Sequence, residues 1–112
     1  KEPTKVPQLV RMLNRELESE DYWKKFNVYF NEVDKDFITA INQKHPTLTQ
    51  NDLRMCTLIR IQLSTKEIAS LLNISVRGVE KGRYRLKKRL NLNNEEDLNK
   101  FILNFKNDSL TN

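Results

Sequence analysis

Apolar residues recur at helical spacing along most of this 112-residue chain, whereas the alternation typical of strands is scarce. Side chains three or four positions apart lie on one face of an α-helix, so each such run predicts an amphipathic helix. Only two glycines and three prolines interrupt the runs. The sequence therefore predicts an all-α protein.

The pattern of residues 1–44 predicts a helical N-terminal extension that is rich in aromatic side chains. The spacing predicts three helices, and the third must end before Pro46 because proline disfavours helical angles at the preceding residue. Asp34 is the expected N-cap of that third helix. We expect the rings to pack in a core, with a dimer or partner surface as the alternative. The apolar positions are Leu9, Val10, Leu13 and Leu17, then Trp23, Phe26, Phe30 and Val33, and then Phe37, Ile38 and Ile41.

The sequence of residues 45–106 predicts a second unit, a four-helix domain. Residues 107–112 are expected to form a frayed tail. A Ser, Thr or Asn followed three positions later by an acidic residue can form a capping box, in which each side chain bonds to the other residue's backbone N–H. Three such pairs start predicted helices: Thr49 with Asp52, Ser64 with Glu67, and Asn93 with Glu96. The apolar stripes that follow them are Leu53, Cys56, Ile59 and Leu63, then Ile68, Leu71 and Leu72, and then Leu98, Phe101, Ile102 and Phe105.

The pattern of residues 64–90 predicts a short helix, a three-residue turn and a longer helix over about 76–90. Asn73 suits the left-handed position that ends a helix. Ile74 is expected to pack beneath the turn, and Ser75 is a good N-cap for the next helix. This arrangement is typical of a helix-turn-helix, whose second helix enters the major groove of DNA.

The net charge of +5 is concentrated in the longer of these two helices. Residues 75–91 carry seven Lys and Arg side chains against Glu80 alone. A solvated helix face usually has acidic residues four positions from its basic ones, so an uncompensated block indicates a surface for nucleic acid or another polyanion. The sequence therefore predicts sequence-specific binding to double-stranded DNA.

Directions around the predicted helix, at about 100° per residue, separate an apolar face centred on Val79 from an opposite polar face. Near the N-terminus, Arg77 and Lys81 are candidates for reading bases. Further along, Arg85 and Lys88 are expected to hold phosphates. The residues expected to contact DNA from this helix are Arg77, Lys81, Tyr84, Arg85 and Lys88, and the apolar face comprises Val76, Val79, Leu86 and Leu90.

Other residues of this segment have expected roles beside the polar face. Thr65 and Lys66 open the shorter helix, whose N-terminal amides can bind a further phosphate. Arg83 is calculated to lie only about 40° from the centre of the apolar face. A buried guanidinium needs a partner, and Glu67 or Asp52 could provide one. We therefore expect Arg83 and Glu67 to be structural.

Residues 48–90 resemble the DNA-binding domain of LuxR-type transcriptional regulators. The resemblance implies a four-helix domain that binds DNA as a homodimer, with its fourth helix at the dimer contact. Candidates for that contact are Leu98, Phe101 and Ile102, for which core packing is the alternative. The positions that match in order and spacing are Leu48, Thr49, Asp52, Lys66, Glu67, Ile68, Ala69, Leu72, Ile74, Ser75 and Val79.

The chain departs from the family pattern at Asp52, where Glu is usual, and at Gly78, where Thr is usual, so no base preference is implied. The W-x-x-F-x-x-x-F stripe and the R-Y-R-L-K-K-R-L run are similar to a subgroup found in many regulators of Bacteroidetes bacteria. There the domain is the C-terminal output of a longer sensor chain. The resemblance thus implies a sensory domain upstream of Lys1.

The sequence has no pattern typical of an enzyme. The single histidine, His45, precedes a proline in a connecting turn, and the single cysteine, Cys56, has no second histidine with which to form a catalytic pair. No glycine-rich phosphate loop or metal-ligand cluster occurs, so we expect no catalytic residue, cofactor or metal. One cysteine excludes an internal disulfide. No apolar run reaches the ~18 residues of a membrane span, so a cytoplasmic protein without membrane contact is expected.

Two other functions stay open. A helical interaction or dimerisation module would use residues 6–33 and bind an acidic partner through its basic helix. Its apolar stripe is shorter than the three or so heptads typical of a coiled coil. A sigma-factor-like domain that reads promoters shares the helix-turn-helix, although the LuxR-type spacing argues against it.

Overall fold

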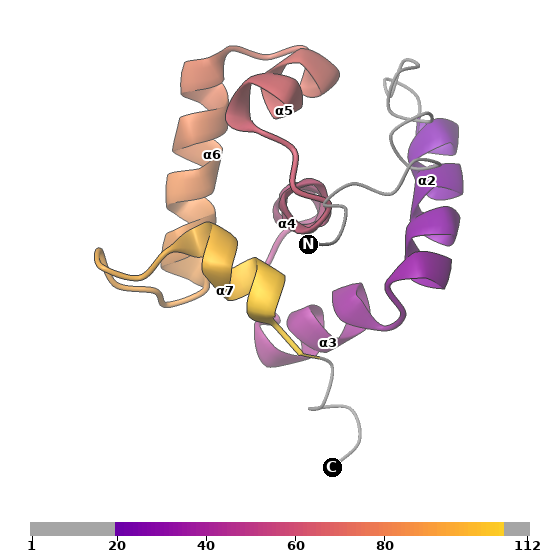
Figure 1. Ribbon diagram of the computed structural model, residues 1–112, viewed down its shortest axis with the longest axis horizontal. Helices are drawn as coiled ribbons and strands as arrows, with labels where there is room; N and C mark the ends of the chain where they lie inside the picture. Colours follow the sequence, from indigo (N-terminus) through magenta and orange to yellow (C-terminus); the bar gives the residue numbers. More distant parts are fainter. Residues whose placement is uncertain (1–19, 107–112) are drawn as a thin grey trace, which may run out of the picture.

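The computed structural model describes residues 20–106, which fold into helices and contain no strand (Figure 1). The prediction of an all-α protein is therefore confirmed for this part of the chain. The predicted helix with Leu9, Val10, Leu13 and Leu17 and the tail 107–112 lie outside the described residues. The helices are α2 (Glu20–Val33), α3 (Phe37–Lys44), α4 (Gln50–Arg60), α5 (Thr65–Leu72), α6 (Val76–Arg89) and α7 (Leu98–Asn104).

Helix α4 is the centre of the fold. It packs on α3, α6 and α7, and in Figure 1 it is seen nearly along its axis, with α6 on one side and α2 on the other. Residues 55–59 are all buried, which is more than one helical face, because α4 has neighbours on several sides. The Thr57 hydroxyl donates to the Leu53 carbonyl at 3.0 Å, so the polar group in this core is satisfied.

Two of the three predicted capping boxes begin helices. The Thr49 hydroxyl accepts from the Asp52 N–H at 3.1 Å, and the Asp52 carboxylate accepts from the Thr49 N–H at 2.9 Å. Ser64 and Glu67 form the same pair of bonds at the start of α5. Each box satisfies backbone N–H groups that have no acceptor within the helix. The predicted starts of α4 and α5 are confirmed.

The third box forms but does not begin a helix. Glu96 accepts from the Asn93 N–H at 2.8 Å, and Asn93 accepts from the Glu96 N–H at 3.0 Å. Helix α7 nevertheless starts at Leu98, with Asp97 as its N-cap, so the predicted start is wrong. Residues 93–97 are exposed and Leu98 is the first buried position. Without an apolar face to bury, the hydrogen bonds of the box close only a turn.

Four aromatic residues of α2 and α3 belong to the same core as the helices that follow. Trp23, Phe26, Phe30 and Phe37 are buried, and successive ring centres lie 5.5, 6.4 and 6.1 Å apart. The Phe37 ring then meets Phe105, just after α7, at 5.8 Å. These are the separations at which aromatic pairs attract one another. The core therefore crosses the boundary that was predicted between residues 44 and 45.

Two predictions at the end of α2 are wrong. Val33 is 48% exposed rather than buried, because the chain turns there and Phe37 takes the next core position against Phe30. Asp34 does not cap α3, whose N-cap residue is Asp36. The Asp34 carboxylate instead pairs with the guanidinium of Arg60, 26 positions along the chain, at 2.6 Å.

Arg60 holds three parts of the chain together. Besides its ion pair with Asp34, it donates to the carbonyl oxygens of Ile102 and Phe105 at 2.7 and 2.8 Å. Its guanidinium carbon lies 4.2 Å from the centre of the Phe37 ring. These contacts tie the end of α4 to the α2–α3 connection and to the end of α7. Sequence reasoning assigned no role to this arginine.

Candidate nucleic-acid interface

Helices α5 and α6 pack on each other and are joined by a turn of three residues, 73–75. Asn73 adopts the left-handed conformation, with φ 58° and ψ 44°, and the Ser75 hydroxyl accepts from the Gly78 N–H at 2.9 Å. Both features were predicted. Ile74, however, is 46% exposed instead of packed beneath the turn. It borders a cavity between the turn and α2, so no core side chain covers it.

The seven basic residues of positions 75–91 divide into two groups by their partners. Three are engaged within the chain and are partly buried: Arg83 with Asn99, Lys87 with the Asn94 carbonyl, and Arg89 with Asp52. The remaining four are exposed and form no hydrogen bond or ion pair within the described residues; they are Arg77, Lys81, Arg85 and Lys88. Only this second group keeps its hydrogen-bond donors for a partner.

The exposed side of α6 carries all five residues that were predicted to contact DNA. Tyr84 is 58% exposed, and the Lys88 ammonium lies 5.1 Å from the centre of its ring. Val76 was predicted for the apolar face, yet it is 39% exposed and joins this surface, because it lies in the first turn of the helix. Glu80 is exposed as well. A shallow depression on this surface is lined by Val76, Arg77, Glu80, Lys81, Tyr84 and Arg85.

The start of α5 has two backbone N–H groups left for a ligand. In the Ser64–Glu67 box the N–H groups of these two residues are already bonded. The N–H groups of Thr65 and Lys66 are among the first four of the helix, which have no acceptor within it. The Lys66 side chain is exposed and that of Thr65 is partly exposed. Glu67 is thus a capping residue, which agrees with its predicted structural role.

Arg83 lies on the inward side of α6, as predicted, but its partner is different. It donates to the side-chain carbonyl of Asn99 in α7. The two predicted partners, Glu67 and Asp52, are engaged elsewhere. Glu67 caps α5, and Asp52 pairs with Arg89 of α6 at 2.7 Å. Burial lowers the pKa of Arg83, and the nearby Asp97 carboxylate opposes that shift. Arg83 therefore connects α6 to α7 and faces away from the exposed surface.

The candidate dimer residues on α7 do not lie on one surface. Leu98 and Ile102 are buried in the core of their own chain, at 5% and 0% exposure. Phe101 is partly buried, with its ring 6.0 Å from His45. A side chain buried within one protomer cannot contact a second protomer, so the prediction that Leu98 and Ile102 contribute to a dimer contact is wrong. Core packing, the alternative, is what the structure shows for these two.

The single cysteine and the single histidine both have shifted pKa values. Burial, followed by the Asp52 charge, raises the pKa of Cys56 to about 12, so its thiol is protonated at neutral pH and is a poor nucleophile. Burial, followed by the charge of Lys44, lowers the pKa of His45. Within residues 20–106, no three His, Cys, Asp or Glu side chains gather where they could hold a metal ion. None of the described helices has the length and apolar character to cross a membrane.

No family model, curated protein or solved structure matches the chain. The likeness to LuxR-type domains therefore depends on the sequence positions given above. The geometry of the site adds one feature independent of it: a basic helix whose buried side is apolar and whose exposed side carries four cations that form no hydrogen bond or ion pair within the described residues.

Proposed function

We propose that this chain binds double-stranded DNA in a sequence-specific manner, as a LuxR-type helix-turn-helix with α6 in the major groove. The observation that carries the proposal is the division of α6 into two sides. Val79 and Leu86 are fully buried, while the exposed side presents Arg77, Lys81, Tyr84, Arg85 and Lys88. A major groove about 12 Å wide admits one such helix, whose donors then reach phosphates and base edges.

The proposed contacts follow the position of each residue along α6. Arg77 and Lys81 lie in the first half of the helix, which enters a groove most deeply, so they read bases. Arg85 and Lys88 lie in the second half and hold phosphates. The free N–H groups of Thr65 and Lys66 at the start of α5 receive another phosphate.

The three basic residues engaged within the chain limit the strength of this interface. Arg83, Lys87 and Arg89 already have partners, so the phosphate contacts proposed for the described residues are those of Arg85, Lys88 and Lys66. With about 0.9 per neutralised phosphate, the slope of log affinity against log salt should be about −2.7 if Arg77 and Lys81 contact only bases, and about −4.5 if these two also reach phosphates. A block in which every cation acted on DNA would give a steeper slope.

Fluorescence anisotropy of a labelled duplex over about 50 to 200 mM salt tests the proposal. We expect binding that weakens with a slope between about −2.7 and −4.5, with some duplex sequences preferred over others at constant salt. Poly-glutamate at matched charge concentration is the control, and it should compete poorly. Absence of binding at low salt, or a flat salt response, contradicts DNA binding. Full competition by poly-glutamate would favour the alternative, an interaction module for an acidic partner.

The wider role that we propose is that of a cytoplasmic transcriptional regulator that binds DNA as a homodimer and responds to an upstream sensory domain. This part comes from the resemblance to LuxR-type regulators alone. A dimer contact on α7 would have to use residues other than Leu98 and Ile102, because both are buried. Sedimentation with and without a two-site duplex measures whether a second copy joins on DNA.

A further inference from the structure

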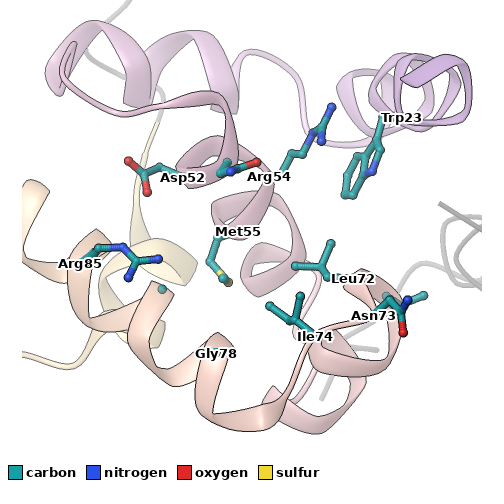
Figure 2. Close-up of a pocket in the computed structure, with 12 residues that line it drawn as sticks. Trp23, Asp52, Arg54, Met55, Leu72, Asn73, Ile74, Gly78 and Arg85 are labelled. Carbon is teal, nitrogen blue, oxygen red and sulfur yellow. The ribbon is translucent and has the colours of Figure 1, made fainter. Parts of the chain in front are cut away.

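A cavity of about 480 Å³ lies beneath the α5–α6 turn, between that turn, α4 and Trp23 of α2 (Figure 2). Pockets that bind small molecules in proteins commonly measure about 300–1,000 Å³. The contacts proposed for DNA do not use this cavity, with one exception. Arg85 lines both the cavity and the exposed depression on α6. The cavity is therefore a separate site that shares one side chain with the proposed DNA surface.

Two glycines of α6, Gly78 and Gly82, line the cavity. A Cβ atom at Gly82 would lie 3.1 Å from the Met55 methyl group, closer than ordinary contact. Ile74, which lies beside Gly78, is 46% exposed, and Leu72 is only partly buried. Apolar side chains thus border an unfilled space, which suits an apolar group of a ligand.

The polar groups around the cavity favour an anion. Two guanidinium groups line it, Arg54 from α4 and Arg85 from α6, with one carboxylate, that of Asp52. The Asp52 carboxylate already pairs with Arg89 at 2.7 Å, whereas Arg85 forms no hydrogen bond or ion pair among the described residues. Arg85 therefore offers the cavity a positive charge that no described residue pairs with.

The arrangement of these groups suits a molecule with one apolar end and one acidic end. Figure 2 shows Arg85 on one side of the cavity and Trp23 on the other, with Met55 and Leu72 between them. The Arg54 guanidinium lies 4.7 Å from the centre of the indole ring. An aromatic body would fit beside the indole and the apolar side chains, while its acidic group reaches Arg85.

We infer that this cavity binds a small amphipathic organic anion, an aromatic carboxylate or sulfonate, with its ring against Met55, Leu72 and Ile74 and its charged group on Arg85. Because the same arginine is proposed to hold a phosphate, the anion and DNA oppose each other's binding. This second part depends on the proposed function. By thermodynamic linkage, each ligand then weakens the other by the same factor.

Binding can be measured without DNA, because Trp23 is the only tryptophan of the chain. The probe is 8-anilinonaphthalene-1-sulfonate, and the matched control is N-phenyl-1-naphthylamine, the same ring system without the sulfonate. We expect saturable quenching of Trp23, a higher melting temperature with the anion, and an affinity for the anion about tenfold above that for the neutral compound. Equal affinities, or no saturable quenching, would overturn the inference.

Substitutions locate the bound molecule. Arg85→Gln should reduce the affinity for the anion to that for the neutral compound, whereas Lys88→Gln, which removes an equal charge outside the cavity lining, should leave it unchanged. Ile74→Phe should place a larger ring where the ring of the ligand is proposed to lie and so prevent binding of both compounds. Ile74 is half-exposed, so the folded state tolerates the larger ring, which a thermal melt verifies. Equal losses in Arg85→Gln and Lys88→Gln would place the anion elsewhere.

The opposition to DNA is measured by anisotropy at saturating anion. We expect DNA affinity of the natural sequence to fall about three- to tenfold and that of Ile74→Phe to stay the same. If DNA is not bound at all, the proposed function fails, while quenching of Trp23 still decides whether the cavity binds the anion. If DNA is bound equally well with and without the anion, the linkage is wrong.

Discussion

Helices α2 and α6 have the same length, 14 residues, and use their most distinctive side chains in opposite ways. Helix α2 turns its rings inward, with Phe26 and Phe30 almost completely buried. Helix α6 lies on the far side of α4 from α2 (Figure 1) and exposes four of its seven cations. Spacing predicts which residues share a face in both helices. Desolvation then decides which face is buried, because a buried ring stabilises the fold and an unpaired buried charge destabilises it.

The exceptions to this contrast have tertiary causes. Helix α2 exposes Val28 and Tyr29, at 60% and 44%, because the core has room for only one side of the helix. Helix α6 accepts Arg83 on its inward side, because Asn99 and the carboxylate of Asp97 compensate the partly buried guanidinium. The inward position of Arg83 therefore depends on partners that a distant segment, residues 97–99, supplies.

The largest effect is expected on stability, when a buried and an exposed residue of α2 are compared. Phe26→Ala should lower the free energy of unfolding by about 3–5 kcal/mol, since the ring is fully buried and its removal leaves a cavity. Tyr29→Ala, on the exposed side, is the control and should change it by no more than about 0.5 kcal/mol. Urea denaturation followed by circular dichroism measures both. Similar losses in the two variants would show that the described core of α2 is wrong.

The next largest effect is expected on DNA affinity, when exposed lysines of the two helices are compared. Lys81→Ala in α6 should weaken binding to the preferred duplex by about 1–3 kcal/mol, while Lys25→Ala in α2, which removes an equally exposed charge, should not. Neither change should lower the melting temperature. Anisotropy with several duplexes provides the measurement.

Lys88→Ala refines the same comparison within α6. As a phosphate contact, it should weaken all duplexes alike and make the salt slope shallower by about 0.9. Should Lys81→Ala also weaken all duplexes equally, Lys81 does not read bases.

The smallest expected effect concerns the inward arginine of α6. Arg83→Met should lower the free energy of unfolding by about 1 kcal/mol through loss of its hydrogen bond to Asn99. Asn99→Ala should cost a similar amount, and the double variant little more than either, because both remove one interaction. DNA affinity of the folded protein should be unchanged. Lost binding with an unaltered melting temperature would instead make Arg83 a DNA contact.

Local features of this protein could be predicted from the order of its residues. The starts of α4, α5 and α6 at Thr49, Ser64 and Ser75, and the end of α5 at Asn73, agree with the structure. Each depends on hydrogen bonds or backbone angles within about four residues. The exposed set on α6 could be predicted for a similar reason, since a regular helix repeats its directions.

Features that join distant segments could not be predicted in this way. Asn93 formed its box without a helix, because the start of α7 depends on where Leu98 meets the core. The partner of Arg83 lies 16 positions away and that of Arg89 lies 37 away. No local rule chooses among several acidic or amide groups at such separations, since the choice depends on how the helices pack.

The division of the basic block on α6 therefore has two sources. Helical periodicity alone indicates that Arg77, Lys81, Tyr84, Arg85 and Lys88 share a face. The packing of α4 against α6 gives Arg89 its partner Asp52, and the connection after α6 gives Lys87 its partner Asn94, so neither cation is available to a ligand. Residues of α2, α4, α5 and α6 together enclose the cavity beside Arg85. Periodicity acts along one helix, whereas these features depend on the distances between helices.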